Sequence, residues 1–98
     1  MTRVGEIPFD SNRKMMTTIH KIGDKYRVIT KGAPDVLLNK CNISSLQKNQ
    51  VQKENLIMAE KALRVIAVSY KDLDKLPSKI ESDNIENNLN FVRINRND

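Results

Sequence analysis

The stretch "KMMTTIHKIGDKYRVITK", residues 14–31, decides the fold of this chain. Its two ends, "KMMTTIH" and "YRVITK", are rich in apolar and β-branched residues, and Gly23-Asp24 between them suits a tight hairpin turn. A two-residue turn pairs Ile22 with Lys25, and the pairing then continues outward in the same register. The sequence therefore predicts an antiparallel β-hairpin.

The predicted register gathers three side chains at the open end of this hairpin. It places Met16 opposite Lys31 and sets Lys14 diagonally beside Lys31 on the same face. The preceding segment "RVGEIPF", residues 3–9, is typical of an edge strand, and the turn chemistry of "DSNR" brings its last residue, Phe9, close to the lysines. A loop of odd length would instead flip the register and separate the lysines.

Two ammonium groups and one aromatic ring suit a ligand that combines a flat ring with an anionic chain. The ring of Phe9 can stack on a base, while Lys14 and Lys31 neutralise phosphates. A nucleotide is such a ligand. The alternative is that both lysines are simply solvated, as lysines at strand ends usually are, and that Phe9 is a core residue.

The rest of the chain predicts two helices, a further strand and a polar tail. The segment "GAPDVLLNKC" predicts a short helix that begins near Pro34, and residues 46–61 predict a second helix. The continuous apolar run "LRVIAVSY", residues 63–70, predicts a strand that is covered on both faces and lies at the centre of the sheet. Residues 73–98 are expected to form a polar loop with a closing strand in "LNFVRI". The residues expected in the core are Met15, Met16, Val65, Ile66 and Val68.

Composition fits one small domain and excludes several classes of site. The chain has 98 residues, of which 39% are hydrophobic and 30% charged. A single cysteine, Cys41, cannot form an internal disulfide and is expected to be a small buried hydrophobe, and one histidine cannot supply a zinc cluster. No apolar run is long enough to span a membrane. The net charge of +5 permits anionic partners, but the basic residues are spread along the whole chain.

The common nucleotide-binding motifs are missing from the sequence. It contains neither G-x-x-x-x-G-K-[ST] nor G-x-G-x-x-G, and its three glycines cannot build either phosphate cradle. Any phosphate contact must therefore come from side chains. There is also no nucleophile motif of the G-x-S-x-G kind.

Three blocks of sequence carry a resemblance to a known family. "PFDSNRKMMTTI", "VITKGAPDVLLNKC" and "ALRVIAVSYKDL" occur in this order within residues 5–72 and resemble the nucleotide-binding domain of P-type cation-transporting ATPases, in particular the calcium-ATPase-like branch. The tail "ENNLNFV" is similar to a returning strand of that domain, more loosely. The resemblance implies an α+β fold, an antiparallel sheet with flanking helices, on the cytoplasmic side of a membrane pump.

The resemblance also implies a set of ligand contacts. Phe9 is similar to the ring that stacks on adenine, and Lys14 to a pocket lysine near the nucleotide. Lys31 resembles the lysine deep in the pocket beside the base and ribose, and Gly32 lets the backbone pass close to the ligand. Arg64, in "LRV", is similar to the arginine that reaches toward the phosphates.

Departures from the family pattern imply a fragment, expected to be a single truncated nucleotide-binding domain over residues 1–98. The Asp-Lys-Thr-Gly-Thr motif that such pumps phosphorylate is missing, as are the magnesium-binding motif, the membrane helices and the upstream part with its acidic contact to adenine. The implied function is to bind and position ATP, weakly, for the remaining domains of the parent pump. Catalysis and magnesium then belong to the parent alone, and the fragment by itself is expected to be soluble.

Two other functions compete with nucleotide positioning. A nucleic-acid binder would use the basic charge, but the aromatic residues are not interleaved with lysine or arginine as in an RNP-like strand. An interaction fragment would pair an exposed sheet edge with another chain, including a second copy of itself. We therefore expect an adenine nucleotide rather than a nucleic acid as partner.

Overall fold

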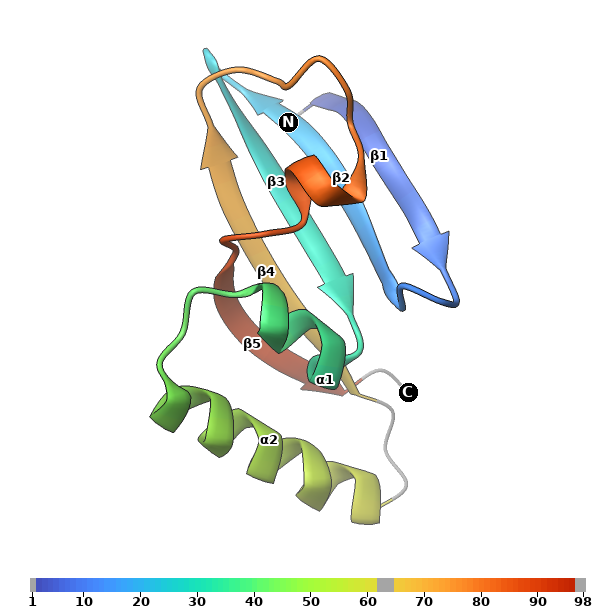
Figure 1. The fold of residues 1–98 in the computed structure, drawn as a ribbon, viewed down its shortest axis with the longest axis vertical. Coiled ribbons are helices and arrows are strands. Elements are labelled where there is room, and N and C mark those ends of the chain that lie inside the picture. The colour runs from blue at the N-terminus through green and yellow to red at the C-terminus, as the bar shows by residue number, and fades with distance from the viewer. Residues whose placement is uncertain (1, 62–64, 97–98) are drawn as a thin grey trace.

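The computed structural model describes residues 2–61 and 65–96 and has an α+β fold (Figure 1). Its strands form one antiparallel sheet in the order β1-β2-β3-β4-β5, so each strand pairs with its neighbours in the sequence. This confirms the expected antiparallel sheet with flanking helices. The elements are β1 (Thr2–Asp10), β2 (Met15–Ile22), β3 (Lys25–Gly32), α1 (Pro34–Leu37), the 3₁₀ helix η1 (Leu38–Lys40), α2 (Ser45–Glu60), β4 (Val65–Leu73), α3 (Ser82–Ile85) and β5 (Asn90–Arg96).

The central hairpin has the predicted turn and the predicted register. β2 ends at Ile22 and β3 begins at Lys25, so the loop has two residues, and Gly23 adopts a φ of 60°. Tight hairpin turns favour glycine because it takes a positive φ without steric cost. Met16 pairs with Lys31, as the sequence predicts.

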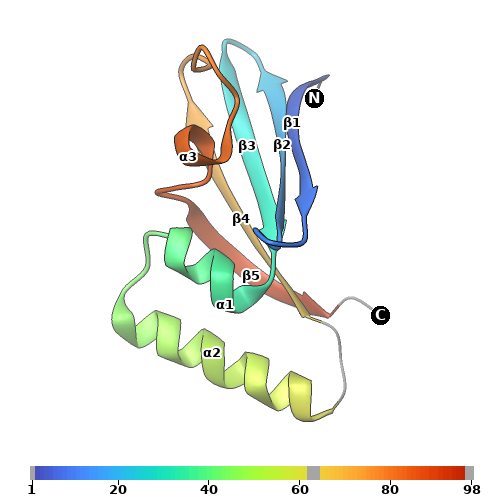
Figure 2. The same ribbon diagram turned by 45° about the vertical axis from the view of Figure 1, so that its right-hand side comes forward.

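Helices α1 and α3 pack against the same face of the sheet (Figures 1 and 2). Their side chains complete two apolar clusters on that face. The first cluster contains Met15, Leu37, Ala67 and Leu89, and the second contains Ile19, Val28 and Ile85. The opposite face of the sheet has no helix over it in the described part of the chain (Figure 2).

The prediction for β4 was wrong in two respects. β3 is the central strand of the sheet, and β4 lies between β3 and β5. Only one face of β4 is fully covered, because Ala67 and Ser69 are buried whereas Ile66 and Val68 are half-buried. The apolar run is continuous because the half-buried face carries apolar side chains too.

Residues 73–98 contribute more to the core than their polar composition indicates. β4 extends to Leu73, and the short helix α3, which the sequence did not predict, brings Ile85 into the second cluster. Leu89 is fully buried in the first cluster. These isolated apolar residues become core through contacts with strands far away in the sequence.

The helix predicted at 46–61 is confirmed as α2, and its start is defined by a capping box. The hydroxyl of Ser44 accepts the Gln47 backbone N–H at 3.1 Å, while the Gln47 side chain accepts the Ser44 N–H. α2 has no buried residue and lies beyond the end of the sheet (Figure 2). None of the described helices is both long enough and apolar enough to cross a bilayer.

Cys41 follows η1 and packs, half-buried, against the first apolar cluster. Burial raises the pKa of its thiol from 9.0 to about 11, and a hydrogen bond with Ser69 acts in the opposite direction. The neutral thiol therefore stabilises the fold fully below pH 9, and this contribution is lost as the pH rises toward 11.

We expect Cys41 to react slowly with iodoacetamide at pH 8. A pKa of about 11 in place of 9.0 lowers the reactive thiolate fraction on the order of 100-fold. The rate is measured by mass spectrometry in buffer and, as the control, in urea that unfolds the chain. Equal rates in the two conditions would contradict the burial of this thiol.

Candidate functional site

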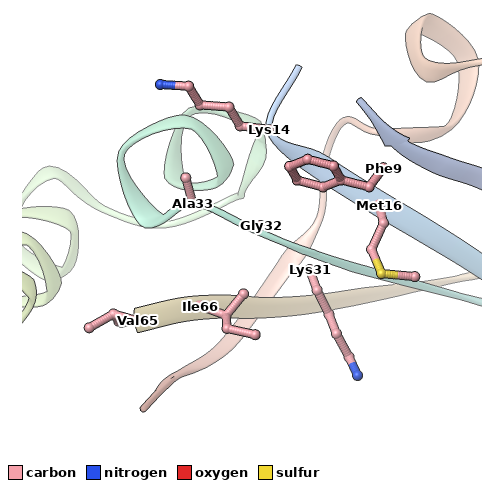
Figure 3. A pocket seen from close by; sticks show the side chains of 8 residues that line it. All are labelled: Phe9, Lys14, Met16, Lys31, Gly32, Ala33, Val65 and Ile66. Atoms are coloured by element: carbon pink, nitrogen blue, oxygen red, sulfur yellow. The ribbon is translucent and has the colours of Figure 1, made fainter. Parts of the chain in front are cut away.

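A cavity of about 500 Å³ opens where the ends of β1, β3 and β4 meet (Figure 3). Four of the five residues predicted to bind a ligand line this cavity. Arg64, the fifth, lies outside the described residues. The lining residues are Phe9, Lys14, Met16, Lys31, Gly32, Ala33, Val65 and Ile66.

Phe9 faces this cavity because β1 contains a bulge. Ile7 pairs with Thr17 and Asp10 pairs with Met15, so two residues of β1 oppose one residue of β2. Strict alternation would turn Phe9 toward the same buried face as Ile7. The extra residue re-aims the side chain, and Phe9 is 63% exposed and outside both core clusters. The alternative that Phe9 is a core residue is therefore wrong.

Lys14 belongs to the turn between β1 and β2, not to β2 as expected. Its φ of 60° is unusual for a residue other than glycine, and its backbone N–H donates to the Asp10 carbonyl. Its own carbonyl accepts the N–H of Ala33 at 3.1 Å. The positive φ breaks the alternation, so the Lys14 and Lys31 side chains extend to opposite sides of the cavity (Figure 3).

The carboxylate of Asp10 closes the turn that carries Lys14. Its Oδ1 accepts the backbone N–H of Asn12 at 2.7 Å and that of Arg13 at 3.4 Å. Aspartate commonly stabilises turns in this way, by accepting from the backbone two residues on. Asp10 therefore fixes the conformation of the turn through contacts within the chain.

The two lysines give the cavity a positive charge. Within residues 2–61 and 65–96, neither Lys14 nor Lys31 forms an ion pair, and both are exposed. Unpaired ammonium groups on either side of an open apolar cavity attract an anionic group of a ligand.

Among the described residues no group of three His, Cys, Asp or Glu side chains is placed to hold a metal ion.

Gly32 is required by the close approach of the turn to β3. A Cβ atom at this position would lie 2.5 Å from the Lys14 carbonyl oxygen and 2.7 Å from Cγ of Met15. The missing side chain thus makes room for the backbone that positions Lys14. Room for a ligand at Gly32, the reason drawn from the resemblance, stays a prediction.

Sequence reasoning missed the apolar part of the cavity. Met16, Val65 and Ile66 were expected in the core but are half-buried and line the cavity, whereas Met15 is fully buried. The alternation of a strand could have revealed this, because adjacent residues face opposite sides of the sheet. Only one of Met15 and Met16 can therefore join the core. Ala33 was not considered at all.

The described lining of the cavity combines apolar groups with cationic ones. It offers an exposed phenyl ring, aliphatic and thioether side chains and two cations. It includes no Ser, Thr, Cys, His, Asp or Glu that could act as nucleophile or general base. Such a surface accommodates a flat apolar ring and an attached anion.

Comparison with known proteins gives consistent matches. A family profile described as "P-type ATPase, cytoplasmic domain N" matches residues 1–94. Calcium-transporting ATPase 1 of Bacillus cereus is 36% identical over 102 residues, which cover 94% of this chain and 11% of that protein. Calcium-transporting ATPase 1 of Lactococcus lactis is 40% identical over 79 residues, covering 70% of this chain and 9% of the relative. The chain spans about a tenth of the length of these relatives.

Proposed function

This chain belongs to the P-type cation ATPase family, as its cytoplasmic domain N, and from this premise we propose that it binds ATP and positions it for the rest of a pump. The observation that carries the proposal is the exposed ring of Phe9 at the mouth of an apolar cavity. Contact between an exposed phenyl ring and water is unfavourable. An adenine base is flat and can stack on the ring, which removes that contact.

The lysines and Gly32 complete the proposed site. Lys31 lies beside the base and ribose, and Lys14 attracts the phosphate chain from the other side of the cavity. Gly32 holds the Lys14 turn close to the end of β3. The family resemblance adds Arg64 as a proposed contact to the phosphates.

The partners proposed for this domain are the remaining domains of a cation pump. The two relatives described above carry the name calcium-transporting ATPase, so we propose a parent pump of that branch. Magnesium and the phosphorylated aspartate belong to the parent, and this chain supplies binding and orientation. Catalysis of phosphoryl transfer consists mainly of positioning the reactants and stabilising charge. A domain that orients ATP therefore contributes to the rate enhancement without supplying a reacting group.

We expect ATP to perturb a saturable subset of backbone amide signals in a two-dimensional NMR titration without magnesium. The affected residues should cluster around Phe9, Lys14 and Lys31, and GTP at equal concentration should perturb them less. A spectrum that is well dispersed but unchanged by both nucleotides would refute nucleotide binding by this chain. Shifts spread over all basic residues alike would instead indicate non-specific attraction of the anion.

A further inference from the structure

A buried carboxylate lies behind the cavity and has no part in the site described above. Glu86, directly after α3, is 1% exposed. Charged side chains are almost never buried this deeply unless they are paired. Oε1 of Glu86 accepts from Nε of Arg13 at 2.7 Å and from the hydroxyl of Ser82, and Oε2 accepts from the hydroxyl of Thr17. Both oxygens are therefore held by donors.

Arg13 connects this carboxylate to the bulge that exposes Phe9. Its Nη2 donates to the carbonyl of Pro8 at 2.9 Å, on β1, and to the carbonyl of Met15 at 2.7 Å, on β2. These two carbonyls lie where the regular ladder between the strands is interrupted. A guanidinium group is planar and presents its N–H donors in a fixed fork, so holding Nε at Glu86 also fixes the direction of Nη2.

We infer that Arg13 and Glu86 form a positioning pair that maintains the β1 bulge and thereby keeps the Phe9 ring at the cavity. Glu86 orients the guanidinium group, and the guanidinium group ties the carbonyls of both strands across the bulge. The link to nucleotide affinity rests on the proposed function, whereas the link to the conformation of the turn does not.

The burial of this pair makes its role testable. The Arg13 side chain is only 17% exposed and that of Glu86 not at all, so water cannot replace a lost partner easily. Throughout the described part of the chain, every buried side-chain nitrogen or oxygen has a hydrogen-bond partner. Removing the charge of Glu86 weakens its hold on the Arg13 guanidinium group, because charge-assisted hydrogen bonds are about twice as strong as neutral ones. It also reverses the contact at Oε2, where an amide nitrogen would donate to the Thr17 hydroxyl instead of accepting from it.

The test uses the full chain with Glu86→Gln, which keeps the side-chain size and removes the charge. We expect faster hydrogen exchange at the amides of Lys14 and Ala33, whose hydrogen bonds fix the turn. We also expect the Kd for ATP to rise roughly 2- to 30-fold, the range for residues that act on a site through others. Arg13→Lys is the second variant, because it keeps a positive charge beside Glu86 but has no fork for the two carbonyls.

The matched control is Val28→Ala, which removes packing from the second apolar cluster. Exchange at amides in the middle of β4, which carries none of the three substitutions, serves as an internal reference for global destabilisation. The inference is supported if the turn amides lose protection beyond that reference in both variants, and the ATP Kd rises in them but not in Val28→Ala.

Two results would overturn it. One is that the Lys14 and Ala33 amides in Glu86→Gln and Arg13→Lys are as well protected from hydrogen exchange as they are in the Val28→Ala control. The other is an unchanged ATP Kd in variants whose turn is loosened. If the unaltered chain fails to bind ATP, the proposed function fails, and hydrogen exchange still decides whether the pair holds the turn.

Discussion

Replacing Phe9 by alanine is expected to weaken ATP binding roughly 5- to 150-fold. This range corresponds to the 1 to 3 kcal/mol, roughly, that stacking of a base on an aromatic side chain is worth when measured by alanine substitution. The ring is 63% exposed, so its removal should lower the free energy of unfolding by about 1 kcal/mol or less. Affinity and stability therefore separate in this variant.

The measurement is the Kd for ATP from the saturation of amide shifts, together with the urea midpoint of each variant. Leu46→Ala is the matched control, because Leu46 is a large apolar side chain that is 68% exposed on α2, away from the cavity. Phe9→Tyr keeps a stacking surface and should retain affinity close to that of the unaltered chain. If Phe9→Ala binds ATP as tightly as the unaltered chain does, the ring has no role in binding.

The sequence predicts the part of the fold and site that depends on local rules. A two-residue turn at Gly23-Asp24 determines the register of the hairpin, and with it the placement of Lys31 opposite Met16. The start of α1 follows from the break at Gly32 and from Pro34. The helix α2 was predicted because the apolar residues of that segment do not alternate as they would in a strand. Each of these inferences needs only residues that are close in sequence.

The exposure of Phe9 and the position of Lys14 could not be predicted in the same way. Both depend on the bulge between β1 and β2, which Arg13 holds with the help of Glu86. Glu86 lies more than seventy positions after this turn, and its own neighbours in the sequence are rich in asparagine. Local patterns cannot reveal a hydrogen bond between such distant residues.

The same limitation explains the errors about β4 and about the buried residues of the tail, whose closing strand in "LNFVRI" is confirmed as β5. The sequence shows that β4 is apolar, but which strand becomes central depends on how many strands follow it and where they pair. Ile85 and Leu89 are isolated apolar residues among polar ones, and only tertiary packing gives them partners. Sequence reasoning was thus reliable for adjacent strands and weak wherever the chain returns from a distance.

Replacing Gly32 by alanine is expected to have the largest effect on stability among the substitutions in the site. The new Cβ would lie 2.5 Å from the Lys14 carbonyl oxygen and 3.0 Å from Cα of Met15. Backbone atoms cannot rotate away as the end of a side chain can. We expect a loss of about 1–3 kcal/mol, typical of overpacking, and a fall in Tm of about 4–8 °C for each kcal/mol.

Gly32→Ala should also weaken ATP binding, because the clash pushes away the carbonyl of Lys14 that accepts the Ala33 N–H. Thermal unfolding followed by circular dichroism gives the Tm, and the amide titration gives the Kd. The control is Gly5→Ala, where the nearest atom is Cδ1 of Ile80 at 2.8 Å, the mobile end of a side chain. Gly5→Ala should therefore lower the Tm less and leave the Kd unchanged. Equal Tm losses for the two variants would mean that the Lys14 turn can move away from β3, and that the site does not depend on their close contact.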